Sequence, residues 1–267
     1  MTTRLAAMIA FAMPTAVLAA PVAANALPTD PLDSPMWEFH AQRLFGKAHV
    51  VFDHAVRVHI PVVAENQRVF PVTVDARALP GVERIVIFAD LNPIPVAIDY
   101  TTLTSAPFVA TRIKLDQRTP VRAAVLTHDG VWHLAGQWID AAGGGCSAPP
   151  VSRVKGDWAD HLGEARAAAW SEGSGQTRLR MTFRHPMDTG LVENIAAYNI
   201  ERLTIRDTDG TVLGQMSVNG SVAEDPAFTV MVRNGGHPIA FVAADSAGLK
   251  FTGAATAGAL RMASVDP

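Results

Sequence analysis

The stretch Thr177-Arg178-Leu179-Arg180-Met181-Thr182-Phe183 decides the fold class, because polar and apolar residues alternate along it. A period of two residues places one face of a β-strand in a core and the other in solvent. Comparable runs rich in β-branched residues occur through most of the chain, and in its first half no long helical pattern separates them. The sequence therefore predicts an all-β protein built from two immunoglobulin-like antiparallel β-sandwiches.

The expected strands form two groups. The first group has about seven strands, at residues 55–63, 69–74, 83–89, 94–100, 108–115, 121–127 and 130–140. The second group has strands at residues 177–183, 200–205, 212–218, 228–232, 239–243 and 249–252. His128-Asp129-Gly130 is typical of a hairpin turn between the last two strands of the first group.

Two helices are also expected. Ser34 is suited to cap a short amphipathic helix that has Pro35 at its first position and ends before Gly46, and its aromatic residues should cover an end of a sheet. Residues 157–170 carry apolar side chains at helical spacing and predict a second helix in the connection between the sandwiches, with Gly173-Ser174-Gly175 as a linker.

These signals divide the chain into four parts. We expect a signal peptide at residues 1–26, a first sandwich at 27–148, a linker at 149–175 and a second sandwich at 176–267. Apolar residues make up 49% of the chain and charged residues 18%, which is the composition of a folded protein with a core. The net charge of −3 and the lack of a Lys/Arg run argue against a nucleic-acid partner.

The N-terminal residues have the pattern of a secretory signal peptide. Arg4 precedes an apolar stretch at residues 5–20, and Ala24-Asn25-Ala26 is a small-x-small cleavage site. A retained membrane anchor is the alternative, but Pro14 interrupts the stretch and a span needs ~20 apolar residues. We therefore expect export to the periplasm, cleavage after Ala26 and no membrane attachment of the mature chain.

Cys146 is the only cysteine of the chain. An unpaired thiol in an oxidising compartment is reactive, protected or joined to another molecule. Gly143, Gly144 and Gly145 precede it, and three glycines in succession indicate a flexible arm. The glycines and the following Ser147-Ala148-Pro149-Pro150 predict that Cys146 is accessible and not a small core residue.

The nine histidines show no metal-ligand spacing, so we expect neither a metal site nor a cofactor. His49, His54 and His59 are five residues apart, which sends His54 and His59 to opposite faces if both lie in one strand. His185 and Met187 could flank the thiol or bind copper, but Pro186 and Gly190 favour a turn.

A cysteine hydrolase is the enzymatic alternative, with Cys146 as nucleophile and a histidine as base. A catalytic nucleophile needs a fixed geometry, which three glycines do not supply. We therefore predict no catalytic residue.

The first region contains three distinctive motifs: Leu79-Pro80-Gly81-Val82-Glu83, Ala89-Asp90-Leu91-Asn92-Pro93 and the Gly-Gly-Gly-Cys segment at 143–146. With these motifs it resembles SoxY, the sulfur-carrying subunit of the periplasmic thiosulfate-oxidising system. The second region contains His185-Pro186-Met187-Asp188-Thr189-Gly190, the segment 219–226 and Asp245-Ser246-Ala247-Gly248. With these motifs it is similar to the partner subunit SoxZ. Their order is that of the fused SoxYZ-like carriers associated with quinoprotein dehydrogenases.

The resemblance implies a carrier and not an enzyme. Cys146 would hold a sulfur intermediate, with His185, Met187 and Asp188 in a supporting loop and the covalent adduct in place of a cofactor. The implied partners are periplasmic redox or sulfur-transfer enzymes, among them a quinoprotein dehydrogenase or a c-type cytochrome. The alternative is a binding or accessory module for a metal ion or a quinoprotein dehydrogenase, with no carrier role.

One feature departs from the SoxY pattern, in which the cysteine arm is a free C-terminus. Here Ser147-Ala148-Pro149-Pro150 continues into the second region. The sequence therefore predicts a loop tethered at both ends, and Pro149 and Pro150 stiffen one side of it.

Overall fold

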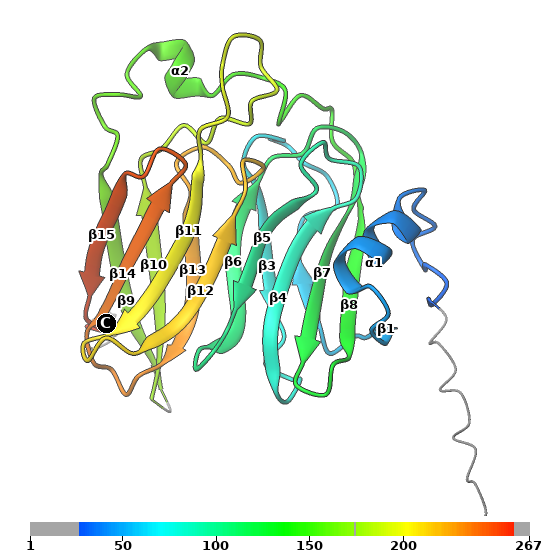
Figure 1. Cartoon of the computed structure of the whole chain (residues 1–267), viewed down its shortest axis with the longest axis horizontal. Coiled ribbons are helices and arrows are strands. Elements are labelled where there is room, and N and C mark those ends of the chain that lie inside the picture. Colours follow the sequence, from blue (N-terminus) through cyan, green and yellow to red (C-terminus); the bar gives the residue numbers. More distant parts are fainter. Residues whose placement is uncertain (1–26, 174, 259–267) are drawn as a thin grey trace, which may run out of the picture.

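The computed structural model describes residues 27–173 and 175–258. The expected signal peptide at 1–26 lies outside the described residues, as do Ser174 and residues 259–267. The described part is mostly β-structure in two sheets, with two helices, so the predicted all-β fold is confirmed (Figure 1). Neither of these helices is long and apolar enough to cross a membrane.

From Leu27 onward, the first half of the chain contains one helix and eight strands. They are α1 (Trp37–Phe45), β1 (Val50–Phe52), β2 (Arg57–His59), β3 (Phe70–Asp75), β4 (Val82–Ala89), β5 (Val96–Thr101), β6 (Ala106–Ile113), β7 (Thr119–Thr127) and β8 (Trp132–Ile139). The second half contains α2 (Val151–Lys155), β9 (Ala165–Gly173), β10 (Gln176–Phe183), β11 (Ile200–Asp207), β12 (Val212–Val218), β13 (Ala227–Arg233), β14 (Ile239–Asp245) and β15 (Lys250–Ala255).

Both sheets run through both halves of the molecule. The nine-stranded sheet has the order β1-β8-β7-β4-β5-β12-β11-β14-β15, and the six-stranded sheet has the order β2-β3-β6-β13-β10-β9. The halves join where β12 pairs with β5 and β13 pairs with β6, both antiparallel. One hydrophobic core cluster contains buried residues from both halves of this double layer. The two sandwiches therefore lie side by side as one continuous structure (Figure 1).

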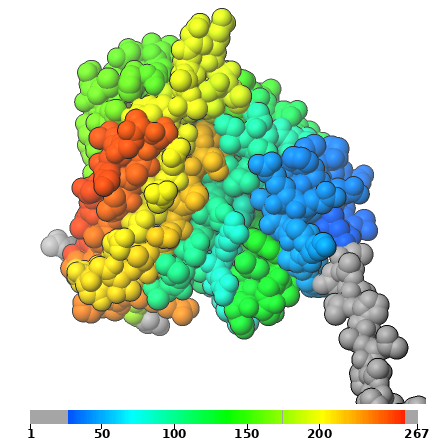
Figure 2. Space-filling view, in the orientation of Figure 1, coloured from blue at the N-terminus to red at the C-terminus, as the bar shows by residue number. Residues whose placement is uncertain are grey.

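The N-terminal helix covers part of the outer face of the nine-stranded sheet. Trp37 and Phe45 of α1 pack in a second apolar cluster with Phe88 and Trp132. Figure 2 shows this N-terminal region in blue over the strands of the first half. The expected helix is confirmed, and it ends before Gly46 as predicted. The predicted start is wrong, because the helix begins at Trp37 with Met36 at the N-cap position and without a side-chain cap from Ser34. Its aromatic residues cover a sheet face and not a sheet end.

The predicted helix at 157–170 is wrong. The helix of the connection is α2, and residues 165–173 form β9, which pairs with β10 from Ala165 opposite Phe183 onward. Ala165, Ala167 and Ala169 alternate with more exposed neighbours and pack against the core. Pairing along the edge of the sheet therefore outweighs the helix propensity of an alanine-rich segment. Of the glycines expected in a linker, Gly173 is the last residue of β9 and Gly175 directly precedes β10.

Candidate functional site

Cys146 is buried, with 1% of its surface exposed. Its sulfur lies 3.9 Å from the backbone oxygen of Lys114, just beyond the end of β6. Burial raises the pKa of the thiol to about 12, although the positive charge of Lys114 opposes that rise. The expectation of an accessible thiol is therefore wrong for this form of the protein, in which Cys146 is a protonated, enclosed group at neutral pH.

The glycines before Cys146 are a fixed and closely packed segment. The Gly145 amide donates to the Leu115 carbonyl at 3.1 Å, and a Cβ on Gly145 would lie 2.4 Å from that oxygen and 2.5 Å from the Gln67 oxygen. Gly143 has a φ of 103°, and its carbonyl accepts from the Gln67 side chain at 2.7 Å. In this conformation the glycines permit close contact between backbones. That Gly143, Gly144 and Gly145 can act as a flexible arm stays a prediction.

Asp116 holds the loop on the other side of the thiol. Its Oδ1 atom accepts hydrogen bonds of 3.0 Å each from the Cys146 amide, the Ser147 amide and the Ser147 hydroxyl. The Asp116 amide in turn donates to the side chain of Asn92 at 3.0 Å. Charge-assisted hydrogen bonds are the stronger kind, so one carboxylate fixes both residues that follow the glycines.

The loop of the second half that follows β10 forms the opposite wall of the site. The Thr189 hydroxyl donates to the Cys146 carbonyl at 2.7 Å. The Lys114 ammonium donates to the carbonyls of Met187 and Gly220, the second at 2.8 Å. The structure therefore brings Met187 and its neighbours beside Cys146, and the same stretch also forms a turn in which Met187 has a φ of 52°.

His185 and Asp188 stabilise this wall and do not contact the thiol in the hydrogen-bond network described. His185 Nδ1 accepts from the Met187 amide at 3.0 Å. The side chain of Asp188 is fully buried and forms an ion pair with Arg153. The Arg153 guanidinium lies 3.7 Å from the centre of the Trp158 ring. These contacts tie the loop to the connection that contains α2.

Burial lowers the pKa of His185 to about 4. The nearest carboxylate oxygen, on Asp245, is 3.6 Å from Nε2 and offsets this only in part. The Tyr198 ring lies against the imidazole, with 4.5 Å between the ring centres. His185 is therefore a neutral acceptor at neutral pH.

The segment beyond Cys146 is also anchored. Arg68 donates to the Pro149 carbonyl at 3.2 Å, and the Glu224 carboxylate accepts from the amides of Val151 and Ser152 at 2.7 Å each. The segment with α2 runs along one end of both sheets (Figure 1). The predicted tether on both sides of Cys146 is thus confirmed.

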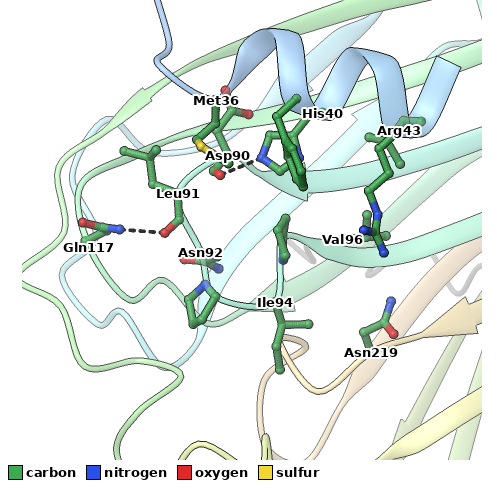
Figure 3. Close-up of a pocket in the computed structure, with 14 residues that line it drawn as sticks. Met36, His40, Arg43, Asp90, Leu91, Asn92, Ile94, Val96, Gln117 and Asn219 are labelled. Carbon is green, nitrogen blue, oxygen red and sulfur yellow. Dashed lines mark hydrogen bonds between the residues drawn. The ribbon is translucent and has the colours of Figure 1, made fainter. Parts of the chain in front are cut away.

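A groove of about 640 Å³ lies next to this site. Figure 3 shows it between α1, with His40 and Arg43, and the loop after β4, with Asn92 and Ile94; Asn219 reaches it from the second half. Asn92 also donates to the Lys114 carbonyl at 2.7 Å. Asn92 therefore connects the wall of the groove directly to the Lys114 carbonyl, which faces the thiol.

The described residues contain no group of three or more His, Cys, Asp or Glu side chains placed to hold a metal ion. His49 and His59 are exposed. His185 and Met187 contact each other through the Met187 amide, and the Met187 sulfur accepts from the Ile200 amide at 3.4 Å. The Met187 sulfur is therefore already engaged by the backbone.

Sequence reasoning missed Lys114, Asp116 and Thr189. The alternation of the predicted strand at 108–115 sends Val109, Thr111 and Ile113 inward, which would place Lys114 on the solvent side. The strand ends at Ile113, and the Lys114 amide bonds to the Ser221 carbonyl at 2.7 Å, which turns the lysine inward.

Family models match both halves of the chain. The model of the sulfur oxidation protein SoxY matches residues 41–146, and that of the sulphur oxidation protein SoxZ matches residues 165–256. The chain is a fusion of SoxY and SoxZ domains. The predicted resemblance is confirmed, and the buried thiol loop is the connection that leaves the SoxY domain. No curated protein matches the fusion.

Two solved structures superpose on this chain with low structural similarity. The sulfur carrier protein SoxY from Chlorobium limicola f thiosulfatophilum is 23% identical over 40% of this chain and 91% of that chain, with a TM-score of 0.36. A β-glycosidase from Bacteroides vulgatus is 8% identical over 75% of this chain and 24% of that chain, with a TM-score of 0.24. Because these TM-scores are low, family membership rests on the two family models.

Gly145→Ala should destabilise the fusion and open the thiol loop. The added methyl group meets two backbone oxygens that cannot move independently, and overpacking of this kind costs about 1–3 kcal/mol. Urea unfolding should show this loss, and iodoacetamide should alkylate Cys146 faster at pH 8. Gly258→Ala is the matched control, because a methyl group added there would have nothing within 4 Å of it. Equal alkylation rates in wild type and a folded Gly145→Ala variant would contradict the close packing.

His185 should make the stability of the fusion depend on pH. Its pKa of about 4 in the folded protein lies below the value of about 6.5 in the unfolded chain. The unfolded chain then binds more protons between these values, so stability falls as the pH falls through this window. His185→Asn can keep the acceptor for the Met187 amide and cannot titrate. Between pH 7 and pH 5, wild type should lose about 2 kcal/mol more unfolding free energy than this variant. Equal losses would show that His185 does not titrate as inferred.

Proposed function

We propose that this SoxYZ fusion is a sulfur carrier that holds a sulfur intermediate covalently on Cys146 for the enzymes of a Sox-type pathway. One observation carries the proposal: the SoxY match ends at residue 146, which is the only cysteine of the chain. The SoxY protein of Chlorobium limicola f thiosulfatophilum is itself described as a sulfur carrier. A carrier, and not an enzyme, is the role that these family matches support best.

The chemistry suits a thiol that can be uncovered. A thiolate joins a sulfur anion such as thiosulfate by forming an S–S bond, and the two sulfur groups together lose two electrons. The Cys146 proton passes to solvent, and a partner redox enzyme accepts the electrons.

The loop must open before this chemistry begins. In the closed form the pKa of the thiol is about 12, so the thiolate is scarce at neutral pH. Opening breaks the hydrogen bonds of Cys146 and Ser147 to Asp116 and that of Thr189 to the Cys146 carbonyl. These are few contacts compared with those of a whole strand, so a local opening costs less than global unfolding. Docking of a partner enzyme supplies a second way to favour the open form.

The arrangement around the sulfur also favours a carrier over a cysteine hydrolase. A catalytic thiol needs a base within hydrogen-bond reach to remove its proton. Among the described residues, the polar contact of the Cys146 sulfur is the Lys114 carbonyl at 3.9 Å, which is not a base. His185, the histidine of the adjoining loop, bonds to the Met187 amide instead.

Export and partner choice belong to the same proposal. The signal-peptide pattern of residues 1–26 supports a periplasmic carrier that begins at Leu27 after cleavage. Its partners are then periplasmic redox or sulfur-transfer enzymes. Association with a quinoprotein dehydrogenase or a c-type cytochrome stays a prediction.

Intact-mass analysis of the protein purified from its native compartment tests the proposal. We expect a chain that starts at Leu27 and carries a sulfur-containing adduct which a reductant removes. The Cys146→Ser variant should lack the adduct, and its chain should still start at Leu27. An unmodified thiol under conditions of active sulfur oxidation, with every sulfur donor supplied, would contradict the carrier role. It would favour a binding module in which the thiol is incidental.

A further inference from the structure

Lys114 is a buried cation that has no carboxylate partner among residues 27–173 and 175–258. Its residue is 5% exposed, and its ammonium donates to two neutral acceptors, the carbonyls of Met187 and Gly220. No salt bridge among the described residues includes Lys114. Burying an ammonium group without a counter-charge is unfavourable, and here burial lowers the pKa of Lys114 to about 8.

The carboxylates nearest to Lys114 are engaged elsewhere. Asp188 pairs with Arg153, and Glu224 accepts from the amides of Val151 and Ser152. Both attract the ammonium, but their effect on the pKa of Lys114 is smaller than that of burial. The site therefore contains a positive charge that lacks a dedicated anion.

The thiol is the group that can supply this anion. Cys146 packs against the Lys114 backbone, and the charge of each residue acts on the pKa of the other. In the unmodified closed loop the thiol is neutral, so it does not neutralise Lys114. A sulfur group bound to Cys146 changes this, because a persulfide or a thiosulfonate carries a negative charge at neutral pH.

We propose that the Lys114 ammonium is the binding group for an anionic sulfur adduct on Cys146, and that it makes the loop retain anionic adducts better than neutral ones. The inference rests on the proposed carrier function. The negative charge on the adduct and the ammonium attract each other in surroundings of low polarity, where such an interaction is stronger than in water. A neutral adduct joined to Cys146 by the same kind of S–S bond is not stabilised by the charge of Lys114. Lys114 thereby keeps an anionic adduct enclosed, whereas a neutral adduct is more exposed to solvent.

Chemically prepared adducts test the inference without any pathway enzyme. Tetrathionate, added in mild urea that opens the loop, undergoes attack by the Cys146 thiolate at a sulfane sulfur. A Cys–S–S–SO₃⁻ adduct forms, thiosulfate leaves and the thiol proton passes to the buffer. Methyl methanethiosulfonate gives the neutral Cys–S–S–CH₃ adduct and methanesulfinate by the same displacement. After removal of urea, intact mass verifies each product.

The readout is the rate at which the uncharged reductant tris(hydroxypropyl)phosphine releases each adduct, divided by the rate for the same adduct in denaturing urea. In wild type, the normalised release of the anionic adduct should be at least ~10-fold slower than that of the neutral one, which corresponds to about 1.4 kcal/mol. In Lys114→Met the two rates should be equal within about twofold. Lys114→Arg, which keeps the charge, should restore part of the difference.

Equal normalised rates in wild type, or a difference that persists in Lys114→Met, would overturn the inference. If Lys114→Met does not fold, Lys114→Gln makes the same comparison, because an amide can donate to the two carbonyls without a charge. The carrier function fails separately, through an unmodified Cys146 in protein from its native compartment. The role of Lys114 is therefore decided by the prepared adducts alone.

Discussion

The three hydrogen bonds that Asp116 Oδ1 accepts from Cys146 and Ser147 determine where the thiol lies. Asp116 is itself held by Asn92, which also bonds to the carbonyl that faces the sulfur. Hydrogen bonds to a charged group are worth about 1.5–3 kcal/mol each, so this one side chain stabilises a loop that contains little apolar surface. Burial of the thiol, and its unreactive state, follow from that position.

The second domain completes the site that the first domain begins. Lys114 comes from the SoxY domain, but the carbonyls that bind its ammonium belong to Met187 and Gly220 of the SoxZ domain. Their distance to Lys114 is fixed because β5 pairs with β12 and β6 pairs with β13, and a common core lies between the sheets. The fusion therefore places the cysteine loop in a seam between two rigidly joined sandwiches. A thiol tethered on both sides can leave this seam only by local rearrangement.

Much of the fold could be predicted because strands with one buried face have a simple period. The run at 177–183 and the hairpin turn at Gly130 appear as expected. The segment 165–173 was not predictable from local pattern, since its alanines suit a helix and only pairing with β10 makes it a strand. The sharing of both sheets between the sandwiches likewise depends on contacts distant in sequence.

The site was predicted less completely than the fold. Cys146 and the stretch with Met187 could be recognised as functional candidates from residue type and motif, and they lie together. The close packing of Gly145 was not foreseen, because conformational freedom and close backbone packing both select glycine, and the sequence does not distinguish them. Lys114 was missed because its inward direction depends on where β6 ends and on the Ser221 carbonyl that its amide meets.

Amide hydrogen exchange of the residues around Cys146, resolved by NMR, tests the closed loop most directly. The amides of Gly144, Gly145, Cys146 and Ser147 all donate to acceptors on Leu115 or Asp116. If the loop is closed in the resting protein, these amides should exchange at least ~100-fold more slowly than in an unstructured peptide. Exchange at the rate of the free peptide, in a protein whose β8 amides remain protected, would show that the glycines form a mobile arm and that the thiol is not enclosed.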